Sequence, residues 1–393
     1  MNRRRRRLPT HPNRGAQNRP GFAMFMALGA LVIIAVLISA SSFITLQESR
    51  LGQNTLVSSR AFSAAEYGLN KIQADWDKTP NLQMANGASF DTSYSLTGQG
   101  TCKVRYTRLN NETFWIVSEG RAAAGNSTAA SRIAVKRVGA ILRLRIPTIR
   151  ANGAVTVNGN VNVQGSPQVN GGNTIPAGWS GCDATAPGLA GIVAPPGASV
   201  TIQKPTQVTG TPQVLRDALV ADSNTYIRYG DETWNTLVSM ANVTITNGNP
   251  PNVAPSLLAD GSCNKADQAN WGEPWRLAGY VAACINYFPI IYSTQSIAFN
   301  GGRGQGILLV DGDVRINGNF EWYGLIVARD DITKGNGNAT LVGAIMARNA
   351  NIADNSEVLG NITVNYSQCS LERAMRGSAQ VVQAKERAWT EIY

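Results

Sequence analysis

The strongest constraint in this sequence is an uncharged apolar segment near the N-terminus. From Pro20 to Gln47 the chain carries no charged side chain. A helix over residues 22–46 would be about 37 Å long, because each residue adds about 1.5 Å, and the hydrocarbon core of a bilayer is about 30 Å thick. We therefore expect residues 22–47 to form a single transmembrane helix.

The charges before this segment predict its orientation. Seven arginines and no acidic residue precede it, and the positive-inside rule places such a flank in the cytoplasm. Everything after residue 47 is then expected outside. The formal charge of +10 falls by seven when this basic leader is set aside, so we expect no nucleic acid partner.

Few side chains are available for chemistry outside the membrane. The single histidine, His11, lies in the leader, so the remainder has no imidazole for a Ser-His-Asp triad or a zinc ligand. The five cysteines are widely spaced, and in an exported chain they suggest disulfides. Cys263 and Cys284 are the nearest pair in sequence and the expected bridge. We expect no cofactor, no resident metal and no enzymatic activity.

An amphipathic helix is expected to continue the apolar segment over residues 48–79. Its apolar residues recur at spacings of three and four, namely Phe62, Ala65, Leu69, Ile72 and Trp76. Pro80 marks the expected end of the helix. The stripe is interpreted as the face that packs on the next part of the chain.

Residues 80–150 predict a small antiparallel β module. Runs such as "TCKVRYTRL" and "TFWIVSEGRA" are rich in β-forming residues and are separated by the turn signals "GQG" and "NNE". A sheet packed on one long helix is the expected arrangement. The 250 residues that follow are too many for a loop, so a second domain is expected.

The second domain, residues 151–369, contains short repeats. From residue 307 the chain reads as units of 18, 19 and 17 residues that open at Ile307, Leu325 and Ala344 and close on glycine. The earlier stretch "AVTVNGNVNVQG" follows the same pattern. Repeats this short, with small strands and Asn-Gly corners, are typical of a parallel β-helix in which corner asparagines can form a hydrogen-bonded ladder.

Two parts of the second half do not follow the repeat. An irregular insertion rich in Pro and Gly is expected at about 175–300, and its tryptophans are interpreted as buried anchors, with sugar stacking as the alternative. Residues 370–393 are expected to form a helical tail over the open end of the solenoid. The predicted fold class is thus α+β: a transmembrane helix with an antiparallel sheet, followed by a parallel β-helix with an insertion.

The leader, the sequence "PGFAMFMALGALVIIAVL" and the sequence "AFSAAEYGL" resemble the N-terminus of bacterial type IV pilin-like proteins, most closely the PilX-type pilus assembly proteins. The resemblance covers about residues 19–75 and extends more loosely to 140. It implies that a prepilin peptidase removes residues 1–21 by cutting after Gly21 and that Phe22 is then methylated. It also implies an assembly helix, which here contains Met26 and Glu66, and other pilins as partners.

This resemblance predicts a subunit of a type IV pilus or a related secretion filament that acts in assembly initiation, tip presentation or adhesion. The protein would lie in the bacterial inner membrane, with its N-terminus cytoplasmic, and would enter a surface filament whose external ligand is unknown. Major pilins carry Glu at the fifth mature residue, where this chain has Met26. The second domain resembles domains attached to such proteins by fold-level analogy alone.

Several alternatives remain open from sequence. The N-terminus is also compatible with a secretory signal cut near Ser39 or with an uncleaved anchor. The whole chain is also compatible with a tethered β-helix that binds or cleaves polysaccharide, using acids such as Asp311, Asp313, Asp330 and Asp331. We expect these acids to serve turns instead, with calcium binding as a further possibility, and "GGRGQG" at 301–306 to be a turn without the features of a phosphate loop.

Overall fold

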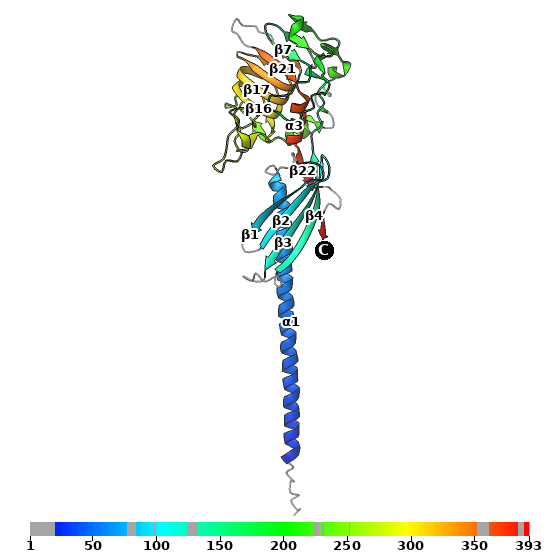
Figure 1. Ribbon diagram of the computed structural model, residues 1–393, viewed down its shortest axis with the longest axis vertical. Helices are drawn as coiled ribbons and strands as arrows, with labels where there is room; N and C mark the ends of the chain where they lie inside the picture. The colour runs from blue at the N-terminus through cyan, green and yellow to red at the C-terminus, as the bar shows by residue number, and fades with distance from the viewer. Residues whose placement is uncertain are drawn as a thin grey trace, which may run out of the picture.

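The computed structural model describes residues 20–76, 84–96, 100–123, 133–222, 228–229, 232–250, 252–335, 337–351, 361–383 and 389–392. One long helix, an antiparallel sheet on its upper part and a head of parallel strands follow one another along the molecule (Figure 1). Residues 1–19 of the expected leader, which is assigned to residues 1–21, lie outside the described residues. The predicted helix end at Pro80 does so as well.

Helix α1 runs without interruption from Pro20 to Ala74. The described side chains from Met24 to Leu56 are exposed, and Val57 is the first buried one. The segment is long and apolar enough to cross a membrane. From Ala61 onward its small and apolar side chains enter a core, so the exposed and packed halves belong to one continuous helix.

The antiparallel sheet contains β1 (Ser89–Leu96), β2 (Gly100–Arg108), β3 (Thr113–Ala123) and β4 (Ile133–Arg145), paired in chain order. Its buried residues alternate along β2 and β3, and this buried face packs on α1. The helix approaches closely at Gly120, where a Cβ atom would collide with the backbone of Ala61 and Ala65. We call α1 from Val57 onward, this sheet and the C-terminal strands described next the helix–sheet module.

The C-terminal segment differs from the predicted helical tail. Helix α3 spans Gln368–Gly377 and packs on strands of the head, but β22 (Gln380–Gln383) and β23 (Trp389–Ile392) then pair with β4. Trp389 contacts Phe62 of α1 edge to face. The head is therefore inserted into the helix–sheet module between β4 and β22 instead of following it, and the chain ends beside β4 (Figure 1).

The head contains one large curled sheet, and within the described residues all of its strand pairs are parallel. Its strands are β5 (Gly153–Val157), β6 (Val161–Val163), β7 (Gln168–Asn170), β8 (Ala190–Ala194), β9 (Val200–Ile202), β10 (Val208–Thr209), β11 (Val214–Arg216), β14 (Val243–Ile245), β15 (Ile290–Ser293), β16 (Ile297–Val310), β17 (Val314–Ala328), β18 (Asp331–Lys334), β19 (Ala339–Ala347), β20 (Asn349–Asn351) and β21 (Ile362–Tyr366). Shorter elements are η4 (Pro205–Gln207), η5 (Ala218–Ala221), β12 (Arg228–Tyr229), β13 (Glu232–Thr233), α2 (Trp234–Ser239) and η6 (Ala282–Cys284).

The predicted repeat register is confirmed. Ile307 pairs with Leu325, and Leu325 pairs with Ala344, as expected for residues that open equivalent units. The earlier stretch stacks on the same units, since β5, β6 and β7 pair with β19, β20 and β21. Two segments far apart in sequence thus form one continuous stack, because each buries the apolar side chains of the other.

A ladder of polar side chains runs along one corner of the stack. The Oδ1 atom of Asp313 accepts a hydrogen bond from the backbone of Asp331, whose own Oδ1 accepts from Nδ2 of Asn349. The Oδ1 atoms of Asn349 and Asn160 accept from the backbone of Asn160 and Ser199 in turn. The expected asparagine ladder is present, with aspartates in its first positions.

The insertion expected at 175–300 is more regular than predicted. It supplies β8 to β11 at one end of the stack and β14 and β15 at the other. Disulfides join Cys263 to Cys284, the pair expected from sequence, and Cys182 to Cys369 at the start of α3. Among its tryptophans, Trp179, Trp234 and Trp271 are buried, in keeping with the anchor interpretation.

Candidate functional site: the exposed helix and the rigid loop of the head

The exposed half of α1 carries most of the exposed large apolar side chains in the described part of the chain. Up to Gln47, its large apolar side chains that face solvent are Met24, Phe25, Met26, Leu28, Leu31, Val32, Ile33, Ile34, Val36, Leu37, Ile38, Phe43, Ile44 and Leu46. An apolar surface of this extent is unfavourable in water and marks a membrane or protein contact. The absence of charges before Glu48 allows this half to lie in hydrocarbon.

The residues expected for processing and assembly all lie on α1, but not together. Gly21 and Phe22 fall in its first turn, where side chains are outside the described set. Met26 is exposed in the apolar half, whereas Glu66 is exposed on the half that packs on the sheet. Forty helical residues separate them by about 60 Å, so they cannot act at one place within a single chain.

The aspartates of the head are used in its own stack. Asp311 forms an ion pair with Arg329, and Asp330 and Asp331 form ion pairs with Arg348. Each arginine lies one coil beyond its partner, so the pairs tie neighbouring coils together. Among the described residues, no group of His, Cys, Asp and Glu side chains is arranged to hold a metal ion.

The segment "GGRGQG" lies inside strand β16 and is not the expected turn, although β16 has a bulge between Asn300 and Gly302. Gly302 has a positive φ and lies against the backbone of Val253, which explains the need for glycine there. Arg303 points to the fully buried carboxylate of Glu273, with two hydrogen bonds of 2.9 and 2.8 Å. The arginine is therefore a partner within the fold.

Glu273 also fixes a surface loop, residues 275–281, that we call the rigid loop. Its Oε1 atom accepts a hydrogen bond from the backbone N–H of Trp275, and its Oε2 atom accepts one from Val281. One buried carboxylate thus holds both ends of the loop, and Cys284 of the Cys263–Cys284 disulfide follows three residues after the loop ends. At the tip, Leu277 is 71% exposed and Tyr280 is 42% exposed.

Arg276 of the rigid loop and Arg373 of α3 both lie over the buried ring of Trp179. The guanidinium carbon of Arg276 is 4.8 Å from the ring centroid, and that of Arg373 is 4.7 Å away. Burial, and then the nearby charge of Arg373, lower the pKa of Arg276 to about 10. Such contacts between cations and aromatic rings are stabilising, and here they join the base of the loop to α3.

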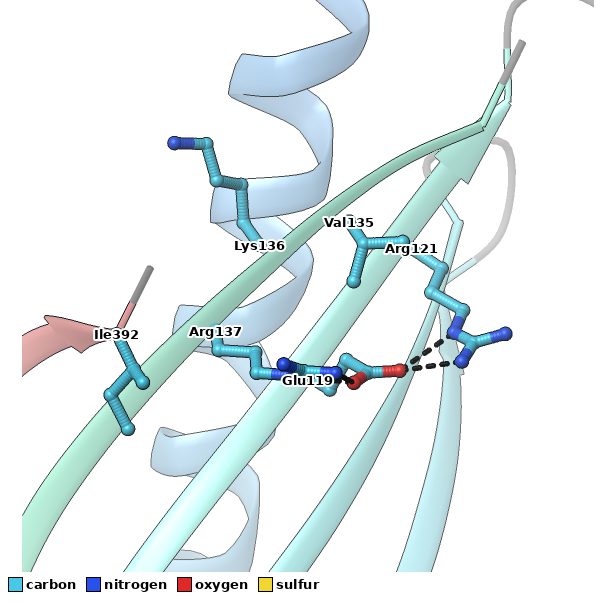
Figure 2. A pocket seen from close by; sticks show the side chains of 6 residues that line it. All are labelled: Glu119, Arg121, Val135, Lys136, Arg137 and Ile392. Atoms are coloured by element: carbon cyan, nitrogen blue, oxygen red, sulfur yellow. Dashed lines mark hydrogen bonds and ion pairs between the residues drawn. The ribbon is translucent and has the colours of Figure 1, made fainter. Parts of the chain in front are cut away.

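A shallow, open pocket of about 330 Å³ lies at one end of the antiparallel sheet. Figure 2 shows Glu119 between Arg121 and Arg137, with Val135 and Ile392 beside them. The carboxylate of Glu119 accepts hydrogen bonds from Nε of Arg121 at 2.8 Å and of Arg137 at 2.7 Å. Burial alone would raise the pKa of Glu119, but these hydrogen bonds outweigh it and lower the pKa.

Sequence reasoning missed three of these features. Nothing in the spacing of Cys182 and Cys369 pairs them, because they are 187 residues apart. Glu273 sits in the irregular insertion, where no periodic pattern marks a buried acid. The arginines of β3 and β4 were visible as alternating charged residues in predicted strands, which was a usable signal for an exposed sheet face.

Comparison with known proteins gives little further guidance. No protein-family model matches the chain, and no curated protein does. Among solved structures, the chain is similar to the competence-associated pilin ComZ from Thermus thermophilus, with 12% sequence identity over 86% of this chain and 97% of that chain and a TM-score of 0.24. A TM-score of 0.24 does not establish a common fold, so the function has to be inferred from this chain's own residues.

Proposed function

We propose that this chain is a pilin-like subunit of a type IV pilus or related secretion filament. One observation carries the proposal: a single helix of 55 residues has an uncharged, exposed apolar first half and a second half packed on an antiparallel sheet. The first half can reside in the membrane before assembly and against other apolar helices after it. A simple membrane tether would not require the same helix to continue into the core of a folded module.

Processing belongs to the proposal. A prepilin peptidase would cut between Gly21 and Phe22, and the new amino terminus would be methylated. The test is intact mass spectrometry of the protein from cells, where we expect a mature chain that begins at methylated Phe22. Gly21→Val should retain the leader, whereas Gly29→Val, at a helical position with nothing within 4 Å of an added Cβ atom, should be processed normally. A Gly21→Val chain that still begins at Phe22 contradicts the proposal.

Met26 suggests the position of the subunit in a filament. In the type IV pilin-like proteins that this chain resembles, the charged amino group of one mature subunit is neutralised by Glu at the fifth position of another. An unpartnered charge at such depth costs about 2.5 to 3.5 kcal/mol, or roughly a hundredfold in assembly. A subunit that enters first has no earlier amino group to neutralise, so this chain fits an initiating or tip position.

Presentation is the proposed role of the head. Its insertion supplies the end strands of the stack, and α3 packs on β16, β17 and β19. The rigid loop supports this role, because Leu277 and Tyr280 are exposed on a loop whose conformation is fixed before binding. Gold labelling of the head on sheared filaments tests the position. We expect sparse labels at filament ends; dense labels along the shaft contradict a tip position but leave the processing test unaffected.

A further inference from the structure

The antiparallel sheet has a second face, turned away from α1, that we call the outer face. Its central apolar residues are Trp115 and Val117 of β3, Ile141 of β4 and Ile392 of β23. Trp115 pairs with Ile141, and the Trp115 and Ile392 side chains approach each other over Gly139, where a Cβ atom would touch both. These side chains are only partly buried, and none of them belongs to the core that the sheet forms with α1.

Basic side chains surround this apolar strip. Asp91 accepts bonds from Arg105 and Lys103, at 2.7 and 3.0 Å, and Glu119 is held between Arg121 and Arg137 (Figure 2). Each carboxylate is thus shared by two cations, which gives four positive charges for two negative ones. The four cationic side chains keep 51% to 60% of their surface exposed, so they can bind further acceptors.

This arrangement of apolar and basic side chains indicates what kind of partner can bind. Apolar side chains with Trp and Arg are the composition of protein interfaces. Two carboxylates inside the face would repel a continuous polyanion, whereas single carboxylates of a protein can meet the outer edges of the guanidinium groups. Arg121 is next to Gly120, which lies against Ala61 of α1. Ala61 is about 21 Å along the helix from Gln47, the end of the uncharged segment, so the Arg121 side chain does not reach the phospholipid headgroups.

Several carboxylates that a second copy would bring are already used within the chain. Among the acids of residues 153–379, Asp311 is paired with Arg329, Asp330 and Asp331 with Arg348, and Glu273 with Arg303. We propose that the outer face docks an acidic, partly apolar segment of a different protein subunit. The inference does not depend on α1 entering a filament, because the face belongs to the sheet.

The experiment uses the full chain in its own cells. A photo-crosslinking amino acid replaces Val117 at the centre of the outer face, and a matched control carries it in place of exposed Leu258 of the head. We expect position 117 to yield one protein adduct whose crosslinked peptide contains neighbouring carboxylates. The combined substitution R121E/R137E should lower the yield at least tenfold, whereas R121K/R137K should retain most of it.

A second variant guards against loss of folding, since R121E/R137E places acids beside Glu119. Val135→Glu adds one negative charge to an exposed position with no ion pair to break, and should also lower the yield. An adduct that persists in both acidic variants, an adduct with lipid or with a second copy, or no adduct at position 117 overturns the proposal. Processing at Gly21 would be unchanged in each case, so this failure is distinguishable from failure of the proposed function.

Discussion

The helix–sheet module and the head bury their strands in different ways. In the module, buried and exposed residues alternate along β2 and β3, because α1 covers one face of the sheet and leaves the other open. In the head, β5 and β8 are buried at every residue, as is most of β19. The sequence of a parallel strand covered on both faces is a continuous apolar run. In an antiparallel sheet covered on one face, apolar and polar residues alternate along each strand.

The helix–sheet module and the head also differ in their balance of basic and acidic side chains. Residues 48–145 and 380–393 carry 15 basic and 9 acidic side chains, against 12 and 16 in residues 153–379. In the head, ion pairs connect successive coils and serve the stack. In the module, the ion pairs of Asp91 and Glu119 lie on the outer face, where their cations stay exposed and can bind further acceptors. The head thus uses these ion pairs between its own coils, whereas the module has an open face that suits the proposed docking of a partner.

The largest effect is expected inside the head. Leu325→Asp places a charge between Ile307 and Ala344 in a stacked apolar column, which should cost more than about 4 kcal/mol. Hydrogen exchange should show loss of protection in β16, β17 and β19 while β1 to β3 remain protected. Leu277→Asp, at an exposed position, is the control and should leave the head folded. Equal loss in both regions would show that they do not fold separately.

The two disulfides provide the next largest difference. Cys182–Cys369 closes 187 residues and Cys263–Cys284 closes 21, so the chain-entropy model predicts that removing the first costs about 2 kcal/mol more. We expect C182S/C369S to lower the denaturant midpoint of the head further than C263S/C284S. The reverse order would indicate that the rigid loop, not the long closure, holds the head together.

The fold was predictable where a pattern repeats within a short distance. The apolar segment, the stripe from Phe62 to Trp76 and the units at Ile307, Leu325 and Ala344 all carry local periodicity, and the structure has a continuous helix and a parallel register there. The insertion of the head between β4 and β22 was not predictable, because pairing between β4 and the last residues has no local signature.

The candidate sites divide along the same line. The exposed apolar helix follows from composition, and the Cys263–Cys284 bridge follows from proximity in sequence. The role of Glu273 depends on Arg303 and on the two ends of the rigid loop meeting in space, which requires the fold. Long-range contacts of this kind cannot be predicted from local sequence patterns.

Smaller effects of opposite sign are expected at Gly120 of the helix–sheet module and at Gly52 in the exposed half of α1. Gly120→Ala forces the helix away from β3 at Ala61 and should destabilise the module by about 1 to 3 kcal/mol. Gly52→Ala, at an exposed helical position with open space around it, should stabilise the helix by up to about 1 kcal/mol. Thermal unfolding in detergent measures both. A neutral Gly120→Ala would show that the helix can shift on the sheet.

The smallest expected effect tests the open face by pH. Hydrogen bonds from Arg105 and then Lys103 lower the pKa of Asp91 well below its usual range. A carboxyl group whose pKa is lower in the folded state stabilises the protein above its unfolded value, near pH 4, and that contribution is lost as the pH falls further. Because both cations are more than half exposed, the contribution is at most about 1 kcal/mol.

Asp91→Asn should therefore lower the unfolding temperature of the module slightly at pH 7, and the difference from the native chain should shrink below pH 4. High salt should reduce the same difference at pH 7, because exposed charges are screened. Arg105→Gln should reproduce the loss, and the double variant should show little added effect if the two side chains act as a pair. A difference that stays constant across this pH range would mean that Asp91 acts through packing, and the outer face would then lack half of the carboxylates that hold its cations in place.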